Sequence, residues 1–547
     1  MKRTAKLVSL ILALVMVAAL FAGCGGETQE QAGQQTAAPT PTPNVFTEGP
    51  AIANTSDEHE LTEETKYADE VIFGYPDVGA VFTPLNANSA GQISQIAYLM
   101  IYNTLLSRDP NKLDGYLPEL ATEWGPNEDY TVWTCKLRDD VKFHNGEPFT
   151  ADDVLFTYEA FMEVPGSTGA LKFGEVTEVE VLGDYEVAFH LEKPNVEFED
   201  NLANHGTLIM NREAVEADPE LGPRIGTGVW KFDDFKANTY LTLVPNENTW
   251  EKPAISKRFT MKTVTEVTSK CIMFENGELD YINDVPAQYL AKYEADPNVA
   301  FDQFASISTN YCAFNMNSPI GGDKNFRYAC AYAVDMEAVN AIATQGTGTG
   351  YKSLAYWGRG TAYQKEFPYE QDLEKAKEYL AQSSYVPGTE VQMMTLSSGI
   401  HADVAQVIQQ QLSEIGINVN IFATDNATMM ANSNWGSTSY DMLVFGGPWQ
   451  IQPSSCFFTM QTGLIGNKAQ FSNARVDELL RMGASTPNGP ERQAIYEEVQ
   501  DILAEEIPYL GTVNPNVTYG RHANCGGVIF FPDGVFDFTY VYKIVEE

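Results

Sequence analysis

The sequence predicts an α/β protein of two or three domains that follow an exported N-terminal segment. Segments with strand and helix patterns alternate along the chain, as is typical of α/β domains. The body behind the N-terminal segment has about 480 residues, more than one hydrophobic core usually holds. Hydrophobic residues make up 44% of the chain and aromatic residues 12%, so apolar material for several cores is present.

The first strands and the first helix follow from the periodicity of the side chains. Residues Glu70 to Tyr75 and Thr131 to Leu137 alternate between polar and apolar side chains, which predicts half-buried strands. Residues Thr150 to Met162 repeat apolar side chains at helical spacing. Thr150 and Asp153 have the spacing of a capping box, so we expect this helix to begin directly after Thr150.

The second half of the chain shows the same alternation. Apolar residues from Val404 to Ile415 have helical spacing and end at Gly416, and Ile417 to Phe422 continues as a predicted strand. A further amphipathic helix is predicted from Ile495 to Leu503 and ends near Pro508.

The first 23 residues are predicted to be a signal peptide that ends before a lipidated Cys24. Lys2, Arg3 and Lys6 precede an uncharged apolar run from Leu7 to Ala22. This run is short for a membrane span, and small residues before a single cysteine suit cleavage. The segment resembles a bacterial lipoprotein signal, although a phenylalanine stands where leucine is usual. An ordinary secretory signal and a retained N-terminal anchor are the alternatives.

Residues 24–66 are predicted to form a disordered tether that holds the body near a membrane. They are rich in Gln, Thr, Glu, Gly and Pro and contain too little apolar surface to fold. A flexible segment of this length spans roughly 35 Å on average. No later segment contains 18 uninterrupted apolar residues.

The charge and the cysteines exclude several classes of partner. The formal net charge is −40, and loss of residues 1–23 would remove three positive charges and no acid. Such a surface repels polyanions, so we expect no nucleic-acid partner. The six cysteines after Cys24 form no Cys-x-x-Cys pair and flank no histidine at metal spacing, which predicts neither a metal site nor a cofactor. The sequence pairs none of them in disulfides; they are Cys135, Cys271, Cys312, Cys330, Cys456 and Cys525.

Several residues that could suggest catalysis have a simpler interpretation. The run from Gly346 to Ser353 has Tyr351 where a phosphate-binding loop needs glycine, so it is interpreted as a loop beside the ligand site. His144 lies in a turn-like stretch and is expected to have a packing role. Asp152 and Asp153 fall in the first turn of the predicted helix, where acids stabilise the helix terminus. We therefore expect no catalytic residue and no enzyme activity.

Seven segments of the chain carry a further pattern. They are Glu119 to Trp124, Tyr130 to Arg138, Val141 to Phe156, Gly226 to Phe232, Asn315 with Asn325 to Asp335, Tyr440 to Gly446, and Arg475 to Pro508. Together, in chain order, they resemble the extracellular solute-binding proteins of the oligopeptide-binding class (family 5), which serve ABC importers. The turn from Gly226 resembles the Gly-Thr-Gly turn of these proteins, with Val229 where proline is usual, and the resemblance covers nearly all of the chain from residue 70 onward.

The resemblance implies the large type II periplasmic-binding-protein fold, an α/β fold with two lobes around a central ligand cleft. It implies a discontinuous lobe I from residues 67–112, 222–306 and 512–547, with an inserted subdomain from 113–221. Lobe II would be 307–511. It also implies a monomer that captures a small-molecule or peptide ligand by lobe closure and presents it to ABC permease subunits, while the lipid anchor holds it at the membrane.

The resemblance places the ligand-facing residues in four segments of lobe II. Glycines there permit close backbone approach, and aromatic rings can cover apolar or sugar surfaces. The candidate ligand residues are Asn310, Tyr311, Tyr356, Trp357, Trp435, Gly446, Gly447, Trp449, Gln450 and Gln452.

One departure from the family pattern leaves the ligand open. Peptide-binding members commonly carry an Asp in the last of these segments, which pairs with the α-ammonium of the peptide. Here Gln450 stands at that place without a gap, and Gln452 stands there after a two-residue shift. A buried ammonium without a paired charge is costly, so either another acid serves or the ligand lacks a free amine. An oligopeptide is the leading prediction, and a neutral oligosaccharide, a secreted hydrolase and a sensor without transport are the alternatives.

Overall fold

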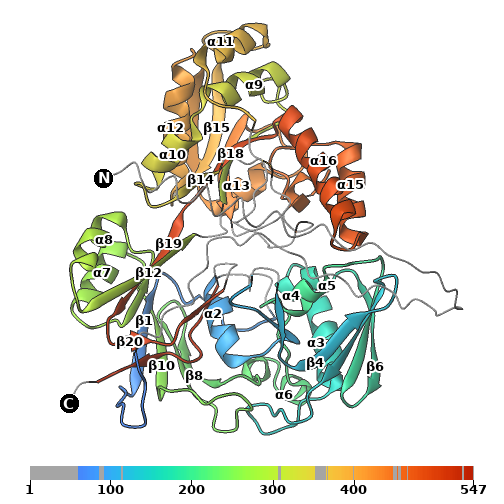
Figure 1. Ribbon diagram of the computed structural model, residues 1–547, viewed down its shortest axis with the longest axis vertical. Coiled ribbons are helices and arrows are strands. Elements are labelled where there is room, and N and C mark those ends of the chain that lie inside the picture. Colours follow the sequence, from blue (N-terminus) through green and yellow to red (C-terminus); the bar gives the residue numbers. More distant parts are fainter. Residues whose placement is uncertain are drawn as a thin grey trace, which may run out of the picture. The chain divides into compact units, whose positions relative to one another are not determined.

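Three β-sheets organise the described part of the chain (Figure 1). The computed structural model describes residues 59–79, 81–85, 92–112, 115–305, 309–351, 365, 368–397, 399–447, 453, 457–464, 466–531 and 535–545. The predicted signal peptide and Cys24 lie outside these residues, as does nearly all of the predicted tether.

The first sheet has seven strands and mixes parallel and antiparallel pairs. β1 (Glu70–Tyr75) lies at its centre, parallel to both of its neighbours, β10 and β11. The sheet also includes β19, which comes from the far end of the sequence. In spatial order the strands are β12 (Val299–Ala305), β19 (Asn516–His522), β11 (Tyr281–Asn283), β1, β10 (Arg258–Thr263), β9 (Tyr240–Pro245) and β8 (Trp230–Lys236).

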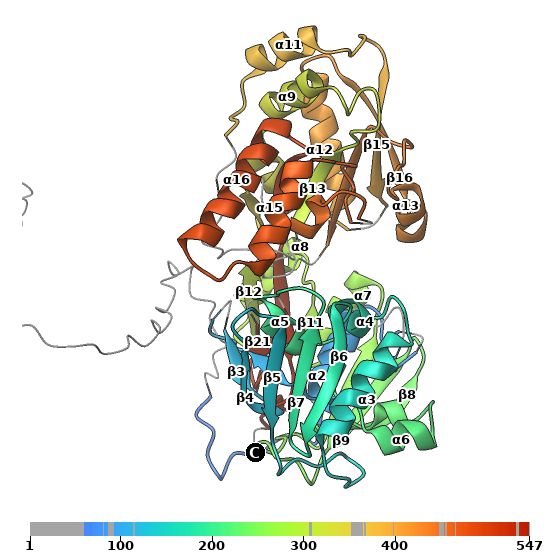
Figure 2. The same cartoon turned by 90° about the vertical axis from the view of Figure 1, so that its right-hand side faces the viewer.

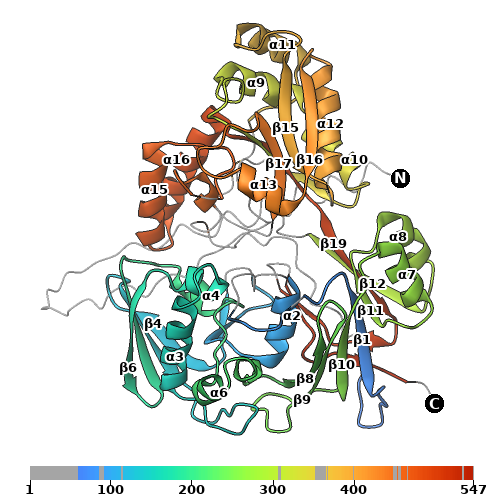
Figure 3. The same ribbon diagram turned by 180° about the vertical axis from the view of Figure 1, so that it is seen from behind.

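The second sheet has six strands and is covered on both faces. β13 shows why: Cys312 and Phe314 pack into one hydrophobic cluster with α9 and α12, whereas Tyr311 and Ala313 pack into another with α15 and α16. Figure 3 shows α12 alongside β15 and β16. In spatial order the strands are β14 (Thr349–Tyr351), β18 (Tyr509–Asn514), β13 (Thr309–Phe314), β17 (Met442–Gly447), β15 (Glu390–Leu396) and β16 (Asn418–Thr424).

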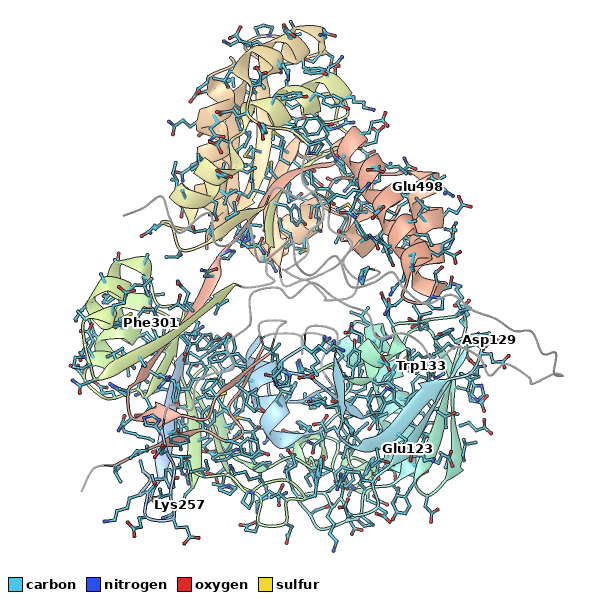
Figure 4. The ribbon with its side chains drawn as sticks, in the orientation of Figure 1. Glu123, Asp129, Trp133, Lys257, Phe301 and Glu498 are labelled. Carbon is cyan, nitrogen blue, oxygen red and sulfur yellow. The ribbon has the colours of Figure 1, made fainter. Side chains whose placement is uncertain are left out.

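The third sheet has four antiparallel strands and carries α3 (Ala151–Met162) beside it (Figure 2). Trp133 lies in its core with Phe198 at 6.0 Å between ring centroids, and Trp133 Nε1 donates to Asn195 O at 3.2 Å (Figure 4). The strands in spatial order are β4 (Ala121–Pro126), β5 (Val132–Leu137), β7 (Glu186–Leu191) and β6 (Val176–Gly183).

Short strand pairs and helices pack around the three sheets, and each sheet with its helices is called a body below. The pairs are β2 (Leu106–Arg108) with β3 (Tyr116–Pro118), β20 (Cys525–Gly526) with β23 (Tyr542–Lys543), and β21 (Ile529–Phe530) with β22 (Phe536–Asp537). The remaining helices are α2 (Gln92–Ile101), α4 (Thr168–Lys172), α5 (Phe198–Leu202), α6 (Arg212–Ala217), η1 (Gly222–Arg224), α7 (Val267–Glu275), α8 (Ala287–Glu294), α9 (Lys324–Ala333), α10 (Met336–Ala343), α11 (Leu373–Gln382), α12 (His401–Ser413), α13 (Asn426–Asn432), η2 (Phe457–Met460), α15 (Ala474–Ser485) and α16 (Pro490–Glu506).

The elements predicted from periodicity are confirmed within a few residues. β1 has the predicted bounds, and α3 begins after Thr150 with the capping box formed: the Asp153 carboxylate accepts from the Thr150 backbone N–H at 2.9 Å. α12 is followed by Gly416 at φ +88°, which turns the chain into β16. The segment interpreted as a loop from Gly346 onward differs, because Thr349–Tyr351 pairs with β18 as the edge strand β14.

A half-buried pair of carboxylates, Glu119 and Glu251, lies between the first sheet and the segment that leads into the third. Asn103 Nδ2 donates to Glu119 Oε1 at 2.8 Å and to Glu251 Oε1 at 3.0 Å. Glu119 Oε2 also accepts from the Thr104 backbone N–H at 3.1 Å. Burial, with the nearby charge of Glu251, raises the pKa of Glu119 from 4.5 to about 7. The folded protein therefore holds a proton here at pH values where the unfolded chain releases it.

Glu119→Gln is expected to reduce the loss of stability with rising pH. An acid whose pKa is raised on folding makes the free energy of unfolding fall as pH rises, here from about 4.5 to about 7. Gln does not titrate, so the thermal midpoint of the variant should fall by fewer degrees over that interval than that of the wild type. Thermal unfolding at several pH values measures this slope, and an unchanged slope would contradict the role of Glu119.

Candidate ligand-binding site

A two-stranded ribbon passes from the first sheet into the second. β12 pairs with β19 up to Ala305 opposite Asn516, and β13 pairs with β18 from Asn310 opposite Val513. The chain therefore crosses twice at one place, upward after β12 and back after Asn514, as β12 and β19 in Figure 1 show. Two adjacent strands resist stretching but can bend, so the ribbon is suited to a hinge.

Asn310 and Tyr311 stand where the ribbon enters the second sheet. Asn310 is 3% exposed, and its Nδ2 donates to Val513 O at 3.3 Å. Tyr311 is 1% exposed and packs edge to face against Tyr509, with ring centroids 5.1 Å apart. The structure therefore places Asn310 at the crossing and Tyr311 in the core between the sheet and the α15–α16 pair.

Gly446 and Gly447 lie beside these residues, whereas Trp435 does not. Gly446 is opposite Asn310 in the register of β17 and β13, at the crossing end of the sheet. Trp435 is 40% exposed in the loop that leads into the start of β17. Two residues later, Ser437 O accepts from Asn315 Nδ2 at 3.0 Å, and Asn315 follows the other end of β13. The structure brings Asn310 and Gly446 together and leaves Trp435 at the opposite end of these strands.

The remaining candidates, Tyr356, Trp357, Trp449, Gln450 and Gln452, lie outside the described residues. Their assignment to a ligand site stays a prediction.

A buried ion pair, which sequence reasoning missed, joins the third-sheet body to the second-sheet body. Arg492 Nη2 of α16 donates to Glu197 Oε1, and the two side chains are 1% and 5% exposed. Next to this pair, the Val196 backbone N–H donates to Ala484 O at 3.2 Å. These four residues are called the clasp below. Because its two halves are almost 300 residues apart, no local pattern in the sequence could have indicated it.

Each half of the clasp is held in place by its own body. Arg492 Nε donates to Gly483 O at 2.9 Å and Nη1 donates to Asn488 Oδ1 at 2.5 Å. Glu197 precedes α5, and its backbone N–H donates to Asn195 Oδ1 at 2.8 Å. Both charges are therefore oriented by contacts within their own body, and the pair joins the two bodies.

A polar pocket of about 240 Å³ adjoins the clasp on the third-sheet body. Its acids are largely compensated: Asp200 pairs with Arg108 at 2.6 Å and with Lys172 at 3.3 Å. Within the described ranges, no three His, Cys, Asp or Glu side chains gather closely enough to hold a metal ion. The pocket is lined by Leu171, Lys172, Glu175, Asn195, Glu197, Asp200 and Asn201.

His144 has structural hydrogen bonds on both ring nitrogens. Gly226 N–H donates to Nδ1 at 3.2 Å, and Nε2 donates to Gly228 O at 3.0 Å. Burial lowers the pKa of His144 to about 4, so the ring is neutral at pH 7. The histidine fixes the Gly226–Gly228 turn against the segment that carries it.

Two large sheets joined by a ribbon of paired strands are the fold of the two-lobed periplasmic binding proteins of type II. Several similar solved structures belong to this class. The chain belongs to the bacterial extracellular solute-binding proteins, family 5: residues 115–467 match "Bacterial extracellular solute-binding proteins, family 5 Middle". It is therefore a solute-binding component of the ABC-importer type. Below, the first lobe is the part with the seven- and four-stranded sheets, and the second lobe is the part with the six-stranded sheet.

Relatives of this family match most of the chain. The probable D,D-dipeptide-binding periplasmic protein DdpA of Escherichia coli K12 is 25% identical over 76% of this chain and 82% of its own length. The oligopeptide-binding protein AppA of Bacillus subtilis is 26% identical over 79% and 84%. The ABC transporter-associated periplasmic binding protein DppA of Helicobacter pylori, solved with the peptide STSA, has a TM-score of 0.74 at 22% identity and covers 88% of this chain and 99% of its own.

Among the described residues, no helix is both long enough and apolar enough to cross a membrane.

Glu197→Gln is expected to shift the ligand-free protein toward the open form. Removing one partner of a buried ion pair leaves the other charge uncompensated, which costs about 3–5 kcal/mol while the pair stays buried. Opening relieves this cost by hydrating Arg492. Small-angle X-ray scattering without ligand should show a larger radius of gyration than for the wild type.

Glu498→Gln is the matched control for this variant. Glu498 lies on the outer surface of α16 (Figure 4), 46% exposed, and pairs with Arg475 at 2.7 Å. Exposed pairs contribute about 0–1 kcal/mol, so this variant should scatter like the wild type. Equal radii for all three proteins would show that the clasp does not influence closure.

Proposed function

We propose that this chain is a lipid-anchored extracytoplasmic protein that captures an oligopeptide between its lobes and delivers it to the permease of an ABC importer. Its membership of family 5, with the ribbon and the clasp on opposite parts of the lobe boundary, carries this proposal. The lobe boundaries predicted from the sequence are part of it: lobe I from 67–112, 222–306 and 512–547, the subdomain from 113–221, and lobe II from 307–511. Residues 512–514 belong to strand β18 of the six-stranded sheet, so the last boundary moves to Asn514.

Lobe closure is the step that the geometry supports. The ribbon can bend between the Ala305–Asn516 pair and the Asn310–Val513 pair, while the clasp contacts form only when the lobes meet. A ligand that touches both lobes stabilises the closed form by its higher affinity for that form. The permease then needs to recognise only the closed form, and no covalent chemistry, cofactor or second copy of the chain is required.

A peptide ligand is supported by the three relatives described above, whose names specify dipeptides, oligopeptides or a bound peptide. A neutral oligosaccharide is the second candidate, and one observation favours it. Gln450 or Gln452 stands where peptide-binding members commonly carry an Asp, and amides suit hydroxyl groups.

Peptides are expected to be released when the gently purified, full mature chain is denatured. Mass spectrometry identifies the released molecules, and calorimetry with a synthetic copy should then give saturable binding without product formation. A matched oligosaccharide fraction is the control ligand. Recovery of sugars, with no binding of any peptide, would contradict a peptide ligand.

Cys24→Ala is expected to release the protein from the membrane. Lipid on the first mature residue is the proposed anchor, and an alanine cannot carry it. Cell fractionation and labelling with radioactive palmitate measure the effect, with Gly25→Ala as the control that keeps the cysteine. A wild-type chain that takes up no label would show that another feature holds it at the membrane.

A further inference from the structure

Asp284 lies where the seven-stranded sheet meets the ribbon. It directly follows β11, which runs parallel to β1 and ends beside it. The next residue, Val285, donates its backbone N–H to Thr518 O at 3.3 Å, and Thr518 is close to the crossing end of β19. Ligands of open α/β sheets bind outside the carboxyl ends of the strands. Asp284 is therefore at the edge of the first lobe from which the ribbon leaves for the second lobe.

A buried relay of hydrogen bonds orients the Asp284 carboxylate. Lys270 Nζ, wholly buried, donates to Asn283 Oδ1 at 2.7 Å. Asn283 Nδ2 in turn donates to Asp284 Oδ2 at 2.5 Å. Among the described residues no other group donates to this carboxylate, so Oδ1 remains available. The relay fixes the carboxylate without forming an ion pair on it.

The backbone of Asp284 is in the left-handed region, at φ +52°. Residues other than glycine are uncommon there, although Asp is among those that tolerate it best. Such conformations persist where the surroundings hold them, and they occur often at ligand sites. At this position the relay from Lys270 and the Val285 hydrogen bond supply that restraint.

Two buried aromatic rings lie near the Asp284 carboxylate. Burial, and then the negative charge of Asp284, raises the pKa of Tyr75, and the same charge contributes at Tyr519. Both tyrosines are therefore close to the carboxylate, and both are buried. Asp284 itself is exposed, so a ligand can reach its carboxylate.

We propose that Asp284 receives the α-ammonium group of a peptide ligand, with Asn283 and Lys270 as positioning residues. The proposal rests on the peptide-binding function proposed above, and it supplies the acid that Gln450 and Gln452 cannot. An ammonium placed here would meet one oriented carboxylate. A carboxylate favours an ammonium over a neutral group.

The test compares two forms of one tetrapeptide library, with free and with acetylated amino termini. The full lipidated chain is purified in detergent as wild type, Asp284→Asn and Glu278→Gln. Glu278 is an exposed acid on the turn before β11, so its substitution changes the net charge equally. Apparent affinities are measured by thermal shift, and the thermal midpoint without ligand reports stability.

Asp284→Asn is expected to weaken binding of the free-amine library about thirtyfold or more, the usual loss when one partner of a buried charge pair is removed. Binding of the acetylated library should change little, and Glu278→Gln should match the wild type for both. Since Asp284 also offsets the buried Lys270 charge, Asp284→Asn can destabilise the lobe. The double variant Lys270→Met with Asp284→Asn removes both charges and should show the same selective loss.

Three outcomes would overturn the inference. Equal losses for both libraries would make Asp284 a purely structural partner of Lys270. Unchanged binding by a folded Asp284→Asn chain would place the ammonium elsewhere, while peptide binding itself stands. A wild type that binds neither library would instead remove the proposed peptide function, and the role of Asp284 with it.

Discussion

The architecture depends on a constraint at one place: two antiparallel strands carry the chain between the two large sheets together. Ala305 lies opposite Asn516 on one side of the crossing and Asn310 lies opposite Val513 on the other. Paired strands keep their register when they bend, so the lobes can rotate without shifting the strands of either sheet. The residues next to the crossing therefore keep fixed neighbours within their own lobe, whatever the angle between the lobes.

Away from the ribbon, a buried charge pair also joins the two lobes. Glu197 and Arg492 are almost fully buried as a pair, yet each is oriented by its own lobe. Burying two charges costs desolvation that their attraction only partly repays, so such a pair adds little net stability to the closed form. It does penalise any closed arrangement in which the two charges do not meet. The clasp thus favours one arrangement of the two lobes over the others.

Local patterns in the sequence predicted much of the fold, and long-range pairing accounts for the rest. α12 and β16 could be predicted because the spacing of apolar residues changes from helical to strand-like at Gly416. This change is visible within a few neighbouring residues. The family resemblance implied the ribbon residues Asn310 and Gly446 as neighbours of the ligand. Trp435 lies at the other end of these strands, and its place in a ligand site stays a prediction. Arg492 gave no signal at all, since its partner Glu197 lies in another sheet's body.

The strength of the clasp sets a balance between affinity and selectivity of delivery. If the closed form is a small fraction of the ligand-free protein, the apparent dissociation constant is the intrinsic one divided by that fraction. A stronger clasp raises the fraction and tightens binding, but it also closes empty molecules that would compete for the permease. Because the two charges of the clasp compensate each other and each is oriented by its own lobe, the clasp restricts how the lobes are oriented in the closed form. It changes the free energy of closing little. Contacts with the ligand can then remain the main contribution that decides between the open and the closed form.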